Sequence, residues 1–161
     1  MADKRLESQV GAALREKGFT ICAAESCTGG LVMSRLTDVA GSSDYVPGGI
    51  VSYSNEAKQK LLSVQEETLI AHGAVSEEVA REMALGARAV FGADFAVSVT
   101  GVAGPGGGTD AKPVGLTYIG LAGPDGLLTV QRHVWDGDRI ANKMSSADAA
   151  LQMALDAVLK N

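Results

Sequence analysis

The sequence has few of the residues that build metal centres, disulfide frameworks and histidine-based catalytic sites. It contains two cysteines, Cys22 and Cys27, and two histidines. Two thiols at this spacing make neither a disulfide framework nor a complete zinc site. No cluster of cysteine, histidine and aspartate has the spacing of metal ligands, so we expect no metal ion and no other cofactor. A reducing compartment fits this cysteine usage best.

Long apolar runs and blocks of one charge are also missing. No run approaches the roughly 20 residues that a membrane-spanning helix needs. The charged start, residues 1–5, is not followed by the apolar core of a signal peptide. The net charge of −5 is spread along the chain, whereas a duplex-binding protein normally presents a basic face. The sequence therefore predicts a cytoplasmic protein with no membrane partner and no nucleic-acid partner.

The chain is long and apolar enough for one domain with a full-sized core, so we expect residues 1–161, 46% of them hydrophobic, to form a single domain. Apolar runs predict strands over residues 19–24, 45–53, 94–99, 114–121 and 127–134. Helical spacing and caps predict helices from residue 6 to Gly18, over 30–38, from Ser54, and over 66–72, 76–91 and 138–159. The short loop 123–126 requires an antiparallel hairpin. The pattern predicts an α/β fold with three α/β/α layers and a mixed, mostly parallel sheet containing one antiparallel strand.

The segment Ala24-Glu25-Ser26-Cys27-Thr28-Gly29-Gly30 connects a predicted strand to a predicted helix. Open α/β sheets bind ligands at the carboxyl ends of their strands, so this turn is the first candidate for chemistry. Ser26 is the candidate nucleophile, because amide N–H groups and the helix dipole would stabilise an oxyanion formed there. The alternative is that Ser26 or Thr28 simply caps the helix, and Cys27 is a rival nucleophile.

A serine nucleophile needs a base, and Lys58 is the best candidate. His72 and His133 lie outside any catalytic motif, and the flanks of Ser26 differ from Gly-x-Ser-x-Gly, so a Ser-His-Asp triad has little support. Lys58 falls in the first turn of a helix, where the dipole and partial burial would lower the pKa of an amine. An ordinary surface lysine is the alternative. Tyr53 ends the preceding strand, where it could orient either group or be a core tyrosine with a hydrated hydroxyl.

A glycine-dense loop follows the third predicted strand, at the sheet edge where Ser26 is also expected. Its consecutive backbone N–H groups would bind an anion, and it lacks the Gly-Lys-Ser/Thr ending of a P-loop. A monophosphate or carboxylate therefore fits better than a nucleoside triphosphate, and a long flexible turn is the alternative. Arg139, at the start of the last helix, could bind a phosphate or be solvated. The candidate ligand-binding residues of the loop are Thr100, Gly101, Gly104, Gly107, Gly108, Thr109 and Lys112.

Five short motifs occur in a fixed order along most of the chain. They are Ala-Glu-Ser-Cys-Thr-Gly-Gly (24–30), Gly-Gly-x-Val-x-Tyr-Ser-Asn-x-x-Lys (48–58), His-Gly-Ala-Val-Ser (72–76), Thr-Gly-x-Ala-Gly-Pro-x-Gly-Gly-Thr (100–109) and Lys-Pro-Val-Gly (112–115). Each motif is modest alone, but the ordered set is highly specific. The set resembles the CinA C-terminal domain family, whose enzymatic members are nicotinamide-nucleotide amidases of the PncC type.

The resemblance implies hydrolysis of the carboxamide of nicotinamide mononucleotide, a small-molecule substrate, to nicotinate mononucleotide and ammonia without a metal. By position it implies that Ser26 is the nucleophile and Lys58 the base, with Tyr53 and Thr100 as supporting polar groups. It further implies an oxyanion held by backbone N–H groups near residues 28–30 (Thr28, Gly29 and Gly30) and a glycine loop against the ligand. A mixed five-stranded sheet and a homo-oligomer are implied as well.

One position departs from the family pattern. Family members usually carry a second arginine one helical turn after Gly-Asp-Arg, where this chain has Asn142 and Lys143. Lysine keeps the charge but not the bidentate fork, so the chain would bind the nucleotide more weakly or lack turnover if that arginine holds the phosphate. Two other functions stay open: a non-catalytic nucleotide-binding module, and a partner in DNA uptake or damage response, which rests on the family's name alone. The larger CinA proteins carry a separate N-terminal domain, so no pyrophosphatase activity is inferred.

Overall fold

The computed structural model, which describes residues 4–161, contains one five-stranded sheet in the order β2-β1-β3-β4-β5. The strands are β1 (Ile21–Glu25), β2 (Gly49–Val51), β3 (Phe95–Gly101), β4 (Leu116–Ala122) and β5 (Leu128–Val134). Parallel pairing joins β1 to β2 and to β3, and antiparallel pairing joins β4 to β3 and to β5. Only β4 therefore runs against the other four strands of this sheet, which confirms the predicted mixed topology.

The strand predicted over residues 45–53 is much shorter in the structure. Only the three residues of β2 pair with β1, in register Ala23 with Gly49 to Glu25 with Val51. Pro47 has no N–H to donate to a strand ladder, and Gly48 has a φ of 159°. Pairing therefore begins late, and Tyr53 lies beyond the end of the strand.

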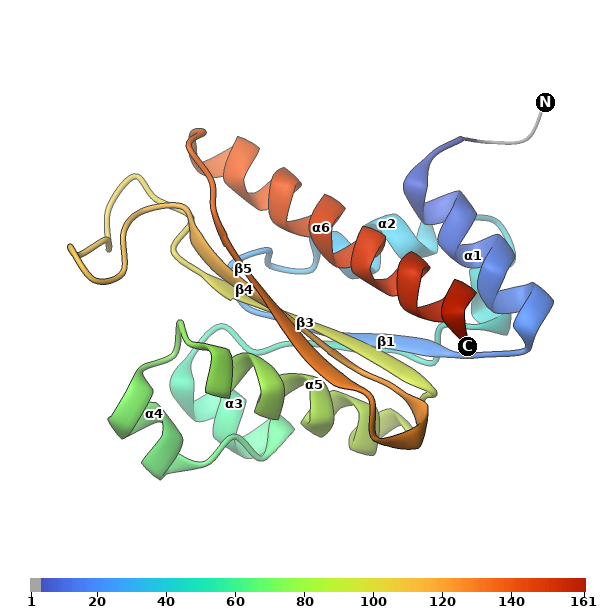
Figure 1. The fold of residues 1–161 in the computed structure, drawn as a ribbon, viewed down its shortest axis with the longest axis horizontal. Coiled ribbons are helices and arrows are strands. Elements are labelled where there is room, and N and C mark those ends of the chain that lie inside the picture. The colour runs from blue at the N-terminus through green and yellow to red at the C-terminus, as the bar shows by residue number, and fades with distance from the viewer. Residues whose placement is uncertain (1–3) are drawn as a thin grey trace.

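Six α-helices cover the two faces of the sheet. They are α1 (Leu6–Lys17), α2 (Leu31–Thr37), α3 (Asn55–Leu62), α4 (Glu66–His72), α5 (Glu77–Phe91) and α6 (Arg139–Lys160). Figure 1 shows α1, α2 and α6 on one face and α3, α4 and α5 on the other, so the three-layer arrangement is confirmed. Within residues 4–161, no helix combines the length and the apolar character needed to cross a membrane.

Helix boundaries follow from local capping chemistry. The side chains of Ser54, Ser76 and Asp138 accept hydrogen bonds from the backbone N–H three residues later, at 3.0, 3.3 and 2.8 Å. These bonds satisfy N–H groups that have no partner within the helix. Gly18 ends α1 with a φ of 71°, a conformation that glycine adopts at low cost. The predicted starts of α3, α5 and α6 and the end of α1 are thus confirmed.

Two apolar clusters fill the space on either side of the sheet. Side chains alternate along the fully buried β1, with Ile21 in the cluster beneath α1 and α6 and Cys22 in the cluster beneath α5. The helices on the second face also contact one another closely. Gly86 of α5 lies against the end of α3, where a Cβ atom would be 1.9 Å from the carbonyl oxygen of Leu62. This glycine lets the backbones of α3 and α5 approach.

Candidate active site

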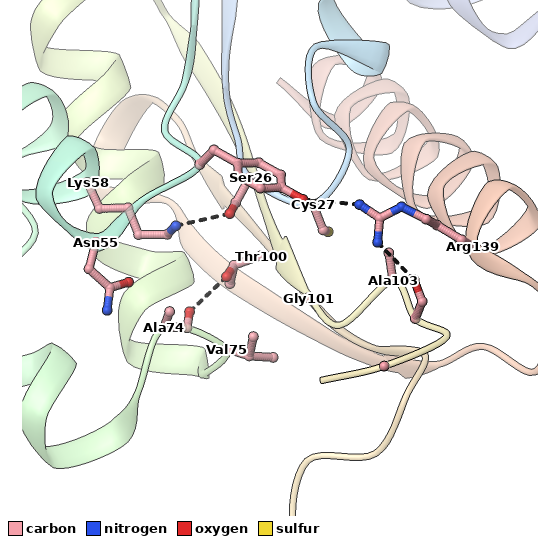
Figure 2. Close-up of a pocket in the computed structure, with 13 residues that line it drawn as sticks. Ser26, Cys27, Asn55, Lys58, Ala74, Val75, Thr100, Gly101, Ala103 and Arg139 are labelled. Atoms are coloured by element: carbon pink, nitrogen blue, oxygen red, sulfur yellow. Dashed lines mark hydrogen bonds between the residues drawn. The ribbon is translucent and has the colours of Figure 1, made fainter. Parts of the chain in front are cut away.

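The carboxyl ends of the four strands that share a direction meet at one edge of the sheet, and a cavity of about 250 Å³ opens there. Ser26 follows β1, Tyr53 follows β2, Thr100 lies at the end of β3, and Arg139 follows β5. Figure 2 shows these elements converging on the cavity. The cavity is lined by Ser26, Cys27, Tyr53, Asn55, Lys58, Ala74, Val75, Thr100, Gly101, Ala103, Gly104, Gly106 and Arg139.

The structure brings Ser26 and Lys58 into direct contact. The Nζ atom of Lys58 lies 3.0 Å from Oγ of Ser26 and 2.8 Å from the carbonyl oxygen of Ser52. Lys58 is 1% exposed and Ser26 is 8% exposed. The cap at Ser54 fixes the start of α3, so Lys58 stands in its first turn and its side chain points back toward the end of β1. Neither side chain has the exposure of an ordinary surface residue.

Burial lowers the pKa of Lys58 below its ordinary value of 10.5. Taking an ammonium group out of water disfavours its charged form, and no aspartate or glutamate lines the cavity to offset that cost. A Lys58 amine that has lost its proton can take the proton of the Ser26 hydroxyl across their hydrogen bond. The geometry and the shifted pKa of Lys58 both suit a general base.

Cys27, the rival nucleophile, also lines the cavity but is less suited to the role. Burial raises the pKa of its thiol to about 11, so the thiol stays protonated near neutral pH. The thiolate is the nucleophilic form of cysteine, and no imidazole lines the cavity to generate it. The ring of His133 stacks on Trp135, and His72 lies in α4 with its ring near Glu78.

Glu25, which the sequence did not single out, holds the turn after β1. It is fully buried and accepts four hydrogen bonds, from the Thr28 hydroxyl at 2.7 Å and from the N–H groups of Gly30, Val32 and Met33 at 3.2, 2.9 and 3.0 Å. A carboxylate beside the first turn of a helix was the signal available in the sequence. Glu25 thus caps α2 in place of Gly30, which has no side chain to do so.

Three residues predicted to bind the ligand in this turn lie outside the cavity lining. The Thr28 hydroxyl is bonded to Glu25, and the Gly30 N–H is bonded to the same carboxylate. The Gly29 N–H donates to the carbonyl oxygen of Ser26 at 3.0 Å. An oxyanion bound by the N–H groups of Gly29 and Gly30, as expected from the sequence, therefore has no free donor at those two residues.

The near half of the glycine-rich loop forms the opposite wall of the cavity. Thr100, Gly101 and Gly104, three of the candidate ligand-binding residues, all line it. The Thr100 hydroxyl donates to the carbonyl oxygen of Ala74 at 2.7 Å, which leaves its oxygen lone pairs available to accept a hydrogen bond. Gly104 has a φ of 88°, and a Cβ atom there would lie 2.5 Å from Val114. The chain can make this close turn only with glycine.

The far half of that loop turns away from the cavity. Gly107, Gly108, Thr109 and Lys112 are absent from the lining. Thr109 and Lys112 bond to each other, with the Thr109 N–H on the Lys112 carbonyl oxygen at 2.8 Å and the Lys112 N–H on Oγ1 of Thr109 at 3.0 Å. The Lys112 ammonium donates to the carbonyl oxygen of His72 in α4. The loop tip is thus fixed against α4.

Arg139 and Tyr53 meet at the open side of the cavity. The Arg139 guanidinium donates to the Gly104 carbonyl oxygen at 2.8 Å and to the Tyr53 hydroxyl at 3.1 Å (Figure 2). Tyr53 is 62% exposed. Within residues 4–161, its hydroxyl bonds to Arg139. The sequence interpretation of Tyr53 as a group that orients Ser26 or Lys58 therefore has no corresponding contact. Its hydroxyl orients Arg139.

The two positions that depart from the family pattern take separate roles. Asn142 is buried, donates to the Ala103 carbonyl oxygen at 3.1 Å and accepts from the Gly137 N–H at 3.0 Å, so it ties α6 to the glycine-rich loop. Lys143 is half-buried and lies outside the cavity lining, with its Nζ 3.7 Å from where a Cβ atom of Gly29 would be. The substitution therefore places a cation behind the turn that carries Ser26.

Five cavity residues were missed by the sequence interpretation, two of which, Ala103 and Gly106, lie in the glycine-rich loop between predicted positions. Ala74 and Val75 precede α5, and Asn55 stands one helical turn before Lys58. The three-residue spacing of Asn55 and Lys58 was a usable signal, because residues at that spacing share a helix face. In the part of the chain that the structure describes, no three side chains of the histidine, cysteine, aspartate and glutamate types are grouped as metal ligands.

A buried serine–amine pair at the carboxyl end of a strand is the arrangement of a nucleophile with its base, and it defines a hydrolase-like class of site. The chain belongs to the CinA C-terminal domain family, whose model matches residues 3–158. It is 49% identical over 164 residues to the nicotinamide-nucleotide amidohydrolase PncC of Enterobacter agglomerans, a match that covers 100% of both chains.

Longer proteins and solved structures share the same domain. The chain is 51% identical over 154 residues to a CinA-like protein of Chloroherpeton thalassium, with 94% of this chain but only 37% of that protein covered. The chain thus spans little more than a third of that relative. The crystal structure of the competence/damage inducible protein CihA of Agrobacterium tumefaciens superimposes with a TM-score of 0.90, at 39% identity and 98% coverage of each chain.

Proposed function

We propose that this chain hydrolyses the carboxamide of nicotinamide mononucleotide, giving nicotinate mononucleotide and ammonia. The observation that carries the proposal is the 3.0 Å contact between the buried Ser26 hydroxyl and the Lys58 amine inside the cavity. The choice of substrate is supported by the similarity to the nicotinamide-nucleotide amidohydrolase of Enterobacter agglomerans, at 49% identity over the full chain. We propose residues 1–161 as one amidohydrolase domain acting without a metal.

The proposed reaction begins with Ser26. Its Oγ forms a bond to the carboxamide carbon while its proton passes to Lys58, and the carbonyl oxygen takes the negative charge. The C–N bond then breaks as Lys58 returns the proton to the departing nitrogen, which leaves as ammonia and gives an acyl-serine ester. Water attacks the ester and loses a proton to Lys58, and the Ser26 oxygen is protonated as it leaves. The acid product and the starting enzyme result.

The charges around the cavity suit an anionic substrate. The protein carries a net charge of −5, yet no aspartate or glutamate lines the cavity, and Arg139 adds a cation to the lining. Arg139 lies at the open side, where its fork of donors would bind a phosphate. The cavity, of about 250 Å³, would hold the pyridine ring and its carboxamide. The ribose and phosphate would then extend toward Arg139.

The cavity lining offers partners for both ends of a carboxamide, from the buried Thr100 and the exposed Asn55. Thr100 has committed its proton to Ala74, so its oxygen can accept a hydrogen bond from the amide nitrogen. Asn55 has a side-chain amide in the same lining, and an amide can donate or accept. A ring-bound carboxamide needs an acceptor for its NH₂ group and donors for its oxygen, and both kinds of group are present.

Ammonia release from nicotinamide mononucleotide by the purified protein, measured beside the Ser26→Ala variant, tests the proposal. We expect the wild type to release ammonia and acid product in equal amounts, and Ser26→Ala to fall by at least about 10³-fold in kcat, because the nucleophile is missing. Activity that survives in Ser26→Ala would move the nucleophile to Cys27. Saturable nucleotide binding without ammonia release by a folded wild type would replace the proposal with a binding module.

Cytoplasmic location and homo-oligomerisation remain predictions that accompany this proposal. Sedimentation of the purified chain would measure its assembly state. A DNA mobility-shift assay at low salt tests the third function considered from the sequence. We expect no shift, because the chain carries a net charge of −5 and duplex binding depends on neutralising phosphates.

A further inference from the structure

The buried charge next to Ser26 takes no part in the proton transfers proposed above. Glu25 is 0% exposed, and it forms no ion pair within the described part of the chain. Burying a carboxylate without a counter-charge is costly unless its lone pairs are filled by donors. A fold that needed only a core residue at this position would use an apolar one, so the carboxylate calls for another explanation.

The donors to Glu25 all come from the seven residues that follow Ser26. They are the Thr28 hydroxyl and the N–H groups of Gly30 and Val32 on Oε1, and the Met33 N–H on Oε2. A carboxylate can accept this many bonds because it has two oxygens and no proton of its own. One side chain thereby fixes the path of the chain from Ser26 into α2.

The same bonds decide which N–H groups stay free beside the nucleophile. The Ser26 N–H donates to Val99, the Gly29 N–H to Ser26, and the Leu31 N–H to Thr28, each to a carbonyl oxygen. Glu25 takes those of Gly30, Val32 and Met33. Among residues 26–33, the N–H groups without an acceptor in the described structure are those of Cys27 and Thr28, and Cys27 lines the cavity.

We infer that Glu25 is a positioning residue that sets the N–H group of Cys27, in the cavity lining, as an oxyanion donor for the reaction at Ser26. The inference rests on the proposed function. With its carboxylate in place, the turn is held by four hydrogen bonds, and the Cys27 N–H keeps one orientation beside the nucleophile. Donors fixed in advance stabilise the charge that develops in the transition state and contribute little to binding of the uncharged carboxamide.

Glu25→Gln and Thr28→Val test this role from the two ends of one hydrogen bond. Glutamine replaces the oxygen that faces Met33 with an NH₂ group, and valine keeps the shape of threonine while removing its hydroxyl. We expect Glu25→Gln to lower kcat for ammonia release by about 10²-fold, the loss typical of a displaced oxyanion donor, with KM within about twofold of wild type. Thr28→Val should lower kcat by about tenfold, and Thr28→Ser should recover part of that loss.

A transition-state probe separates positioning from general damage. The aldehyde analogue of nicotinamide mononucleotide would add the Ser26 oxygen to its carbonyl carbon while the serine proton passes to Lys58, leaving a charged oxygen like that of the reaction. We expect Glu25→Gln to weaken binding of this aldehyde by about the same factor as kcat, because both depend on the oxyanion donors. Binding of the carboxamide should be unchanged.

Glu7 provides the matched control. Its carboxylate is also buried and also contacts α2, through a 2.8 Å ion pair with Arg35, but it lies outside the cavity lining. Glu7→Gln should lower the thermal unfolding midpoint and leave kcat, KM and aldehyde binding unchanged. Wild-type kcat in folded Glu25→Gln and Thr28→Val, or equal losses of aldehyde and carboxamide binding, would overturn the inference. Absence of ammonia release by the wild type would instead refute the proposed function.

Discussion

The cavity has two sides that differ in burial and in the fixity of their side chains. The inner wall, defined by Ser26, Lys58 and Thr100, is almost fully buried, and each of its polar groups is bonded to a strand end or to the neighbouring backbone. The rim, defined by Tyr53 and Arg139, is exposed, and its two members bond to each other across the opening. Burial shifts protonation and fixes geometry, whereas exposed groups move at little cost. Changes in the wall should therefore act on kcat, and changes in the rim on KM.

The largest effect is expected from the wall at Lys58. Lys58→Met keeps much of the side-chain volume and removes the amine, so kcat should fall by about 10²–10⁴-fold, the usual contribution of a general base. KM should change little, because the proposed substrate contact with phosphate lies at the rim. Lys60→Met, an exposed position on the same helix, serves as the control. If Lys58→Met raised KM and left kcat unchanged, the contrast between wall and rim would be wrong.

The pH dependence of the reaction sharpens the same contrast. Burial lowers the pKa of Lys58, so below that pKa the ammonium cannot accept the Ser26 proton and above it the amine can. The ratio kcat/KM should rise with pH, by about tenfold per unit while Lys58 is mostly protonated, and level off below pH 10.5. The unfolded chain holds this proton more tightly, so the contribution of Lys58 to stability also increases as pH rises between its folded and unfolded pKa values. A flat kcat/KM profile in the range below the ordinary lysine pKa would contradict this assignment.

The rim should show a smaller effect of a different kind. Arg139→Ala removes a charged donor from the opening, and hydrogen bonds to charged groups contribute about 1.5–3 kcal/mol, so KM should rise by about 10–100-fold with kcat nearly unchanged. Arg132→Ala, an exposed cation in β5, controls for the change in net charge. Initial rates over a range of nucleotide concentrations measure both constants. A loss of kcat equal to that of Lys58→Met would show that Arg139 belongs functionally to the wall.

The smallest expected effect is that of the Tyr53 hydroxyl. Tyr53→Phe removes its hydrogen bond to Arg139 at 3.1 Å, and one such bond contributes about 0.5–1.5 kcal/mol, so KM should rise by about 2–10-fold. Because the hydroxyl acts through Arg139, the double variant with Arg139→Ala should be no weaker than Arg139→Ala alone. Additive losses in this double-mutant cycle would indicate that Tyr53 contacts the substrate directly.

Much of the fold could be predicted because its signals are local. Caps at Ser54, Ser76 and Asp138 and the stop at Gly18 mark helix ends through bonds to neighbouring residues. The loop 123–126 allows only an antiparallel return. The short β2 could not be predicted, because its length depends on how many residues pair with β1, and apolar character alone overestimates pairing.

The residues of the site can also be divided into those that local sequence signals predict and those that depend on contacts in space. Ser26, Lys58, Thr100 and Arg139 were predictable because the carboxyl ends of parallel strands meet at one edge of a sheet. The sequence could not show that one half of the glycine-rich loop lines the cavity while its tip bonds to His72. The loop has no periodic pattern of apolar and polar residues that would distinguish the two halves. Glu25 was missed because three of its four donors are backbone N–H groups, so only its place beside the first turn of a helix could have indicated its role.

The contact between Gly86 and Leu62 affects the position of Lys58 as well as the packing of the helices. Because α3 can approach α5 this closely, the helix that carries Lys58 packs tightly within the layer that the two helices share (Figure 1). A methyl group at position 86 would push the two helices apart, and we expect this to change the burial that lowers the pKa of Lys58. We therefore expect Gly86→Ala to shift the pH at which kcat/KM of the proposed reaction levels off, without any change around Ser26.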